Sequence, residues 1–214
     1  MARIGTNMTV QVEQTLETAI TDATSITKDP TPVVTTTGAH SLSTGDYIKF
    51  TASAGMVELD GQLVRITTTA TNTFTLDSLD TSDYSTFTAC DIQEVSAWHT
   101  LSNAQSASMP DGTPAKIDLT TLIDKSKQYA YGLADAPDGS IQGLYDPANA
   151  GVVAIKAATK SNTALAFRIT WAGSQITIFN ANVSGGSGFD LAQNDAAKAT
   201  ISFTPVKDVI DYAS

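Results

Sequence analysis

The chain is poor in the residues that usually carry catalysis or bind metals. Among 214 residues it has one cysteine, Cys90, and two histidines, His40 and His99. A single cysteine excludes an internal disulfide and is typical of a protein made in a reducing compartment. The histidines stand far apart, with no acidic residue at a spacing typical of a metal site. We therefore expect no enzyme activity, no cofactor and no metal.

Basic residues and long apolar runs are also scarce. Lys and Arg number 12 against 22 Asp and Glu, which gives a formal net charge of −10. Wrapping nucleic acid or lying on an anionic membrane needs clustered basic residues. No apolar run approaches the roughly 20 residues that span a bilayer. Residues 1–12 lack the apolar core of a secretory signal, so we expect no membrane partner.

One group of acidic residues and one glycine-rich segment could each be a binding site or a local structural feature. Asp135, Asp138 and Asp146 could form a calcium site, but Asp138-Gly139 is typical of a turn and Asp146 of a helix cap. Residues 184–188 are glycine-rich, yet they lack the strand-to-helix context and the lysine of a phosphate-binding loop. We interpret them as a hairpin loop. No catalytic constellation remains.

A strand, a capped helix and a second strand are predicted over residues 139–171. Residues 140–145 alternate in polarity, and Asp146 and Pro147 fit the cap and first position of a helix over 148–159. Residues 165–171 alternate most clearly. The expected core residues are Tyr145, Val152, Ile155, Leu165, Phe167, Ile169, Trp171, Ile201 and Phe203.

The remaining elements are predicted to be strands and loops. A first strand covers 8–13, and residues 16–25 suit either two strands or a short helix. Four short strands at 33–35, 47–50, 63–66 and 74–76 are bounded by turn residues, which is typical of a small barrel or sandwich. A returning strand covers 91–100, and further strands cover 176–183 and 199–204. Residues 102–113 are expected to be a loop, and 206–214 a tail that docks elsewhere.

Residues 116–133 form a long segment with weak periodicity, and we expect a loop. A loop of this length inside a compact domain is usually functional or disordered. The points of contact that we expect along it are Ile117, Leu119, Leu122, Ile123, Lys127 and Tyr129.

Several of these motifs occur together in one known family. Gly132-Leu133-Ala134-Asp135, Asp138-Gly139-Ser140 and Tyr145-Asp146-Pro147-Ala148-Asn149-Ala150-Gly151 follow Ile117-Asp118-Leu119-Thr120-Thr121-Leu122 and Lys127. This order, over residues 98–212, resembles the major tail tube proteins of long-tailed (siphovirus-type) bacteriophages. In that family the segment matching 116–133 packs against neighbouring subunits.

A second resemblance concerns the four short strands. The motifs Ala39-His40-Ser41-Leu42-Ser43-Thr44-Gly45-Asp46, Met56-Val57-Glu58-Leu59-Asp60-Gly61, Asn72-Thr73-Phe74-Thr75-Leu76 and Ser82-Asp83-Tyr84 carry it. They resemble a β-domain of phage virion proteins that is named for the first catalytic-cysteine half-domain of ubiquitin-activating enzymes. The resemblance is to the scaffold alone. It implies an inserted β-barrel-like domain at 26–88 within a discontinuous tail tube domain at 1–25 and 89–214.

The tail tube resemblance implies a mainly β fold, a β-sandwich or half-barrel with one packed α-helix. It also implies a structural virion protein that forms homohexameric rings, stacked into the tube through which DNA is ejected. The implied partners are further copies of the chain and the tape measure, tail terminator and tail-tip proteins. Assembly would take place in the host cytoplasm.

Duplex DNA would pass through such a tube without specific binding. The composition suggests a net negative wall, with Thr177, Asn180, Asn182, Thr200 and Ser202 as wall residues. Arg168 could point into the lumen, and we expect it to pair with an acidic neighbour or to turn outward.

Two alternatives stay open. The same architecture serves the inner tube of a contractile tail or of a type VI-like secretion apparatus, although a sheath would then have to clear the insert. An adhesion or glycan-binding module would need exposed aromatic platforms, which an aromatic content of 7% disfavours.

Overall fold

The computed structural model describes residues 8–110, 112, 114–123, 125–134, 137–186, 188–191 and 195–213. Over these described ranges the fold is mainly β, with 49% of residues in strands and a single α-helix. The elements in chain order are β1 (Thr9–Leu16), β2 (Ala23–Ile26), β3 (Val33–Thr36), β4 (Tyr47–Ala54), the 3-10 turn Val57–Leu59, β5 (Leu63–Thr69), β6 (Thr73–Leu76), β7 (Ala89–Thr100), β8 (Ala104–Ser108), β9 (Pro114–Asp118), β10 (Tyr129–Ala134), β11 (Gly139–Leu144), α1 (Ala150–Ser161), β12 (Leu165–Thr170), β13 (Ile176–Gly185), β14 (Lys198–Pro205) and β15 (Ile210–Tyr212).

One continuous sheet connects almost all of these strands. Its order is β2-β3-β6-β5-β4-β7-β1-β12-β13-β14-β11-β8, and β15 pairs with β13 beside this path. All the pairings along the sheet are antiparallel. The strands β9 and β10 pair only with each other among the described strands.

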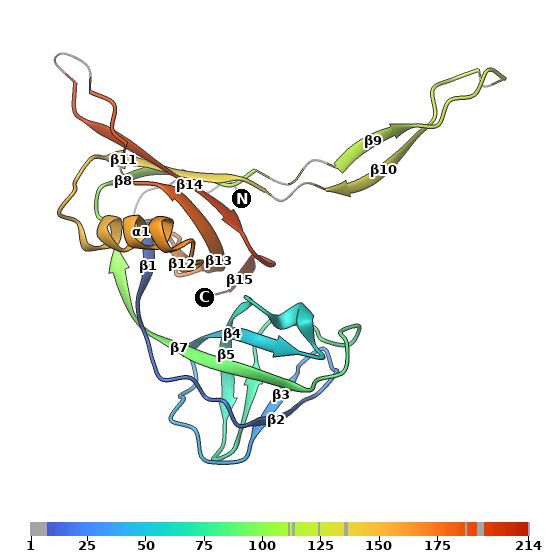
Figure 1. The fold of residues 1–214 in the computed structure, drawn as a ribbon, viewed down its shortest axis with the longest axis vertical. Coiled ribbons are helices and arrows are strands. Elements are labelled where there is room, and N and C mark those ends of the chain that lie inside the picture. Colours follow the sequence, from blue (N-terminus) through green and yellow to red (C-terminus); the bar gives the residue numbers. More distant parts are fainter. Residues whose placement is uncertain are drawn as a thin grey trace.

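The upper part of the sheet curves around α1, and this creates the first core. Val12, Leu101, Ile141, Ile155 and Phe179 are among its buried residues. The rings of Phe167, Phe179 and Phe203 stack on one another with centroid distances of 5.3, 5.6 and 5.1 Å. Figure 1 shows β8, β11 and β14 above the helix, with β1 and β12 on its other side. The prediction of a mainly β fold, a β-sandwich or half-barrel with one packed α-helix, is confirmed.

A second core lies within the segment that contains β2 to β6, at the foot of the molecule in Figure 1. We call residues 26–88 the insertion segment. Ile48, Phe50 and Phe74 are buried there, but the same core also contains Ile92 of β7 and Ile178 of β13. The strand β7 explains this continuity because it pairs with β4 through its first half and with β1 through its second half.

Polar contacts also tie the insertion segment to the rest of the chain. The Lys49 ammonium donates to the backbone oxygen of Ala164 at 2.7 Å and lies 3.6 Å from the Glu13 carboxylate. The Asn180 amide donates to the Gly61 oxygen at 2.9 Å. The Tyr212 ring lies under the Arg65 guanidinium, 4.1 Å from centroid to carbon. The insertion segment is therefore packed onto the sheet.

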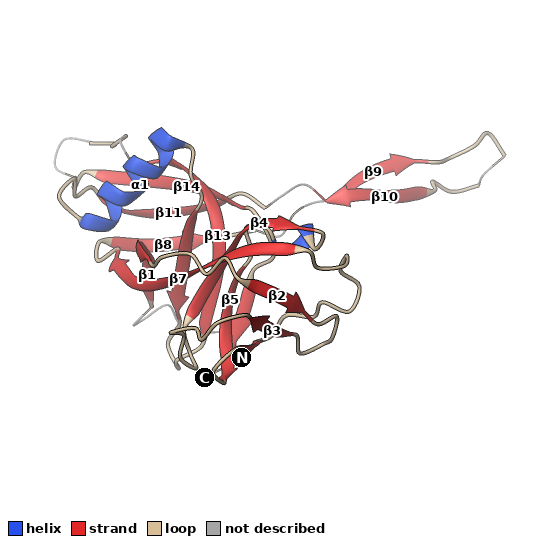
Figure 2. Cartoon of the chain, turned by 60° about the horizontal axis from the view of Figure 1, so that its bottom comes forward, coloured by secondary structure: helices blue, strands red, loops and turns tan. Residues whose placement is uncertain are grey.

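Three sequence-based expectations need correction. Residues 102–113 contain the edge strand β8, which pairs with β11. Residues 116–133 are not a plain loop: β9 and β10 form a hairpin that projects far from the body (Figure 2). The C-terminal tail docks within its own chain, because β15 pairs with β13 and buries Ile210 and Tyr212.

Candidate functional site

The projecting hairpin exposes an unusual amount of apolar surface. We call residues 114–134 the arm. Leu122 is 107% exposed and Ile123 is 91% exposed. Five further large apolar side chains of the arm are exposed: Ile117, Leu119, Tyr129, Tyr131 and Leu133. Apolar surface of this extent on one projection marks an interaction site.

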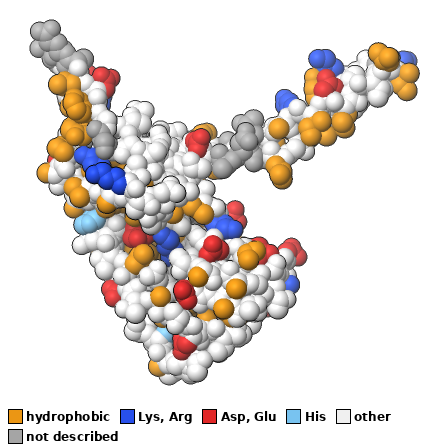
Figure 3. Space-filling view, in the orientation of Figure 1, with side chains coloured by type: hydrophobic (Ala, Val, Ile, Leu, Met, Phe, Trp, Pro, Cys, Tyr) orange, Lys and Arg blue, Asp and Glu red, His pale blue; other side chains and the backbone are white. Residues whose placement is uncertain are grey.

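Both faces of the arm are exposed, and the pairing register explains why its sequence is only weakly periodic. Ile117 pairs with Ala130, and Asp118 pairs with Tyr129, so Ile117 and Tyr129 stand on opposite faces. Neither face packs on the body of the chain, as the space-filling view shows (Figure 3). The described arm residues also include Lys116, Lys125 and Lys127, in a chain whose net charge is −10.

A second surface covers the side of β8, β11, β13 and β14 that faces away from α1. Cross-strand pairs align Ser108 with Ser140, Ser140 with Ser202, and Ser202 with Ser184. We call the aligned set the hydroxyl–amide face; its members are Ser106, Ser108, Ser140, Gln142, Asn182, Ser184, Thr200, Ser202 and Thr204. All nine side chains are polar and uncharged. Most are exposed.

The four strands that carry this face form a unit with two open edges. In the described strands β8 pairs with β11 alone, so its outer edge has no strand partner. On the other side, pairing between β12 and β13 ends at Leu165 and Ala181. Among the described strands, the last residues of β13 therefore pair only with β14, although the Thr159 hydroxyl of α1 donates to the Val183 oxygen at 3.4 Å. Such edges are templates for strand pairing with another chain.

Ionic groups lie at the ends of the hydroxyl–amide face. Asp138 accepts a hydrogen bond from the Thr204 hydroxyl at 2.5 Å, and Lys198 pairs with Asp195 at 2.9 Å. The sequence-based expectation of a net negative wall does not describe this face. Of the expected wall residues, Asn182, Thr200 and Ser202 belong to it, whereas Thr177 and Asn180 are buried elsewhere.

Thr177 and Asn180 have structural partners. The Thr177 hydroxyl accepts from the Trp171 indole at 2.8 Å and donates to the Asp211 carboxylate. The Asn180 amide holds Gly61 of the insertion segment. Thr177 therefore links β13 to β15, and Asn180 links β13 to the turn before β5.

Arg168 is half-buried and lies against aromatic side chains. Its guanidinium lies 4.7 Å from the Trp98 ring centroid and 5.4 Å from that of Tyr47. The Arg168 Nε donates to the Gln11 side chain at 2.9 Å. Within the described residues no acidic side chain pairs with Arg168, and aromatic faces stabilise this cation instead, at the junction with the insertion segment. Its outward orientation relative to a tube lumen stays a prediction.

The helix N-cap is Asn149, and the assignment of the cap to Asp146 and Pro147 is wrong. The Asn149 Oδ1 accepts from the backbone N–H of Gly151 at 2.9 Å and of Val152 at 3.3 Å. Asp146 closes the preceding turn by accepting from the Ala148 N–H at 3.0 Å. Pro147 therefore lies before the helix, not in its first turn.

The other residues expected in the core or in a site have these positions. Ile155, Leu165, Phe167, Ile169, Ile201 and Phe203 are buried, whereas Tyr145, Val152 and Trp171 are half-buried. Lys127 is exposed on the arm. Asp135 lies outside the described residues, and Asp138 and Asp146 have the hydrogen-bond partners given above.

Of the two histidines and the cysteine, His40 and His99 are half-buried and Cys90 is buried. His40 lies edge-on to Phe74, with a ring-centroid distance of 5.1 Å, and His99 pairs with Val12 within the sheet. Burial raises the pKa of the Cys90 thiol to about 12. Within the described ranges, no three His, Cys, Asp or Glu side chains are grouped so that they could hold a metal. The described helix is not long and apolar enough to cross a membrane.

The fold and these surfaces define a class: a β-structural protein with open sheet edges and a projecting apolar arm. Comparison with known families gives the particular family, because residues 54–214 match the phage tail tube protein family. The chain belongs to that family. It is thus a structural, non-enzymatic component of the virion tail that assembles with itself. A comparison with curated proteins found no match.

Proposed function

We propose that this chain forms homohexameric rings that stack into the tail tube of a siphovirus-type phage, the conduit for DNA ejection. The match to the tail tube family over residues 54–214 carries this proposal. The four-strand unit with two open edges supports it, since the edge of β8 in one copy suits the open edge of β13 in the next. Repeated around an axis, such a heterologous contact closes a ring.

The direction of the hydroxyl–amide face supports its use as the inner wall. The face lies on the far side of α1 from the insertion segment, so a wall formed by β8, β11 and β14 leaves residues 26–88 outside (Figure 1). An outer position agrees with a tube that has no sheath. The proposal also includes that residues 26–88 form a separate domain, and that this domain is similar to the β-domain of phage virion proteins described above.

The chemistry of the proposed wall suits a sliding polyanion. Affinity for duplex DNA rises with each phosphate that Lys or Arg neutralises. All nine side chains of the face are uncharged. Their hydroxyl and amide groups can hydrogen-bond to water as well as to a DNA phosphate, so they gain little by exchanging one for the other. DNA would therefore pass without being held.

Electron microscopy of the purified protein at high concentration tests the proposal. We expect hexameric rings or tubes, with tail-tip proteins added as initiator where the chain alone does not nucleate. A species that stays monomeric under both conditions would refute the ring. The tape measure and terminator proteins are expected at the inside and at the end of the same tube.

A further inference from the structure

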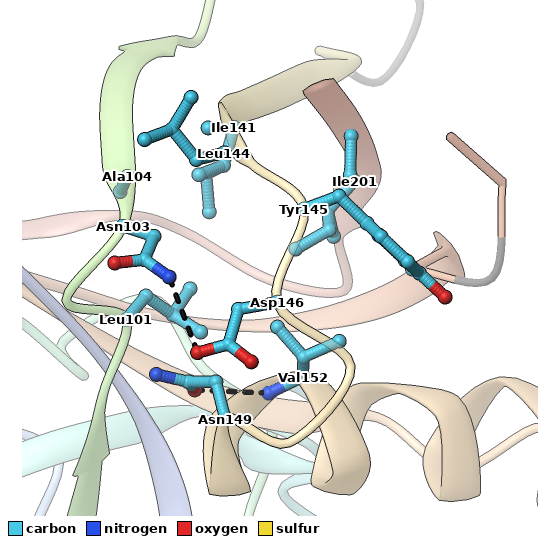
Figure 4. Close-up of a pocket in the computed structure, with 13 residues that line it drawn as sticks. Leu101, Asn103, Ala104, Ile141, Leu144, Tyr145, Asp146, Asn149, Val152 and Ile201 are labelled. Atoms are coloured by element: carbon cyan, nitrogen blue, oxygen red, sulfur yellow. Dashed lines mark hydrogen bonds between the residues drawn. The ribbon is translucent and has the colours of Figure 1, made fainter. Parts of the chain in front are cut away.

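A pocket lies where the first turn of α1 meets the ends of β8 and β11. Figure 4 shows Leu101, Ala104, Ile141 and Val152 around it, with Asn103 and Asp146 as polar groups. The Asn103 amide donates to the Asp146 carboxylate at 3.3 Å. The pocket is open to solvent and mainly apolar.

The rim of this pocket adds further exposed apolar surface. Leu144 and Phe189 are both exposed, and the Phe189 ring packs on that of Tyr145 at a centroid distance of 5.1 Å. Val153 of α1 is exposed as well. The space-filling view shows this second apolar group on the opposite side of the molecule from the arm (Figure 3).

The arm of the same chain cannot fill this pocket. The strands β8 and β11 both run from the pocket to the root of the arm: Ala104 and Leu144 lie at the pocket end, Ser108 and Gly139 at the arm end. Six residues of β11 span roughly 20 Å, and the arm extends further in the same direction (Figure 2). Only another copy can bring an arm to this pocket.

We propose that the pocket bordered by Leu144 and Phe189 is the docking site for the arm tip, Leu122 and Ile123, of a second copy. This inference rests on the proposed tube function and names the receiving surface. The two surfaces complement each other, because fully exposed aliphatic side chains meet an open apolar pocket.

Charge does not decide the contact, because Asp124 and Lys125 both follow the tip in the sequence. In the pocket, Asp146 follows Tyr145, whose ring centroid lies 5.4 Å from the Lys156 ammonium. The contact therefore rests on its apolar groups.

The contact has a direction that suits polymerisation. The arm and the pocket are different surfaces on opposite sides of the molecule. Each copy can therefore dock its own arm on one neighbour and receive the arm of another. A heterologous contact of this kind does not stop at a dimer but continues from copy to copy.

Cysteine cross-linking tests the contact directly. Cys90 is 3% exposed, so an introduced surface cysteine is the reactive one. Leu122→Cys protein is mixed with Leu144→Cys protein under assembly conditions and oxidised. A disulfide requires the two Cα atoms to lie within about 7 Å. Ser41→Cys, on an exposed position of the insertion segment, replaces Leu144→Cys as the matched control.

We expect a reducible heterodimer from Leu122→Cys with Leu144→Cys, and none with Ser41→Cys. Ile123→Cys with Phe189→Cys covers a shifted register. Tubes that form while neither pair cross-links overturn the docking site and leave the tube function standing. Equal cross-linking to Ser41→Cys, or cross-linking of the arm only to another tail protein, also overturns it. Wild-type protein that never assembles refutes the tube function itself.

A second measurement does not depend on disulfide geometry. Leu122→Asp should raise the concentration needed for assembly by about 100-fold or more, the order expected for one buried leucine contact replaced by a charge. Val57→Asp changes an exposed apolar residue of the insertion segment and should have little effect. Equal effects of the two substitutions would overturn the docking site.

Discussion

The buried ion pair between Lys49 and Glu13 should be the strongest single polar link between the insertion segment and the sheet. Their side chains are 7% and 10% exposed. Lys49 also donates to the Ala164 oxygen, and Glu13 accepts from the Ala166 N–H at 3.1 Å. Lys49→Met would leave the Glu13 carboxylate buried without its cation.

Breaking a buried pair from one side typically costs 3–5 kcal/mol, because an uncompensated charge remains. The Ala166 N–H still stabilises the Glu13 carboxylate, so we expect about 3 kcal/mol. For a chain of this size that corresponds to a fall in Tm of about 6–12 °C. Calorimetry or circular dichroism of the unassembled subunit measures this shift.

Two controls separate burial from simple charge loss. Lys49→Met with Glu13→Gln should recover most of the loss, since the remaining amide is neutral. Lys198→Met breaks a shorter pair, 2.9 Å, whose side chains are 54% and 51% exposed, and should cost less than about 1 kcal/mol. A loss at Lys49 no larger than at Lys198, or no recovery in the double variant, would refute the reasoning.

Three further predictions follow from single contacts. Asn149→Ala should cost about 1 kcal/mol in thermal unfolding, more than Asp146→Ala, because Asn149 caps two N–H groups of α1; the reverse order would restore Asp146 as the cap. Glu94→Gln should raise Tm at neutral pH and not below about pH 3. Burial first, then Asp46 and Glu17, raise the Glu94 pKa, so stability is lost as rising pH ionises this carboxyl; an equal gain at both pH values would contradict this. Gln142→Lys should make empty tubes retain duplex DNA at low salt and release it as salt rises, whereas Gln142→Ser should not; retention by both would exclude a charge effect.

Much of the fold could be predicted from alternation and turn residues. The strands of the insertion segment, β12 and β13 could be predicted because their apolar residues are regularly spaced and polar turns separate them. The burial itself is not one-sided, since parts of β4, β12 and β13 are buried on both faces. The helix was also predictable, but its cap was not. Asp146 followed by Pro147 fits the usual start of a helix, while Asn149 fits equally well as a cap three residues later. Only the observed contacts of Asn149 distinguish the two.

The arm and β8 could not be predicted because their strand character does not depend on burial within the chain. The strand β8 consists of small and polar residues and is defined by its pairing with β11. The arm exposes apolar residues on both faces, so it shows no alternation of core and solvent. The apolar points along the arm were visible in the sequence. Their placement on a projecting hairpin was not.

The distribution of charge bears on how a tube of this chain would treat DNA. A wall lined with carboxylates would repel phosphates over about 10 Å at physiological salt, and a wall with lysines would hold them. The hydroxyl–amide face does neither, while ionic groups such as Asp138 and Lys198 stand at its ends and are already bonded to Thr204 and Asp195. Along a wall without charges, the interaction energy between the duplex and the wall varies little with the position of the duplex, because each wall hydroxyl keeps a water as its hydrogen-bond partner while the DNA moves past. Sliding then requires no compensation between attraction and repulsion, and the acidic residues of the chain remain free to keep the outer surface soluble.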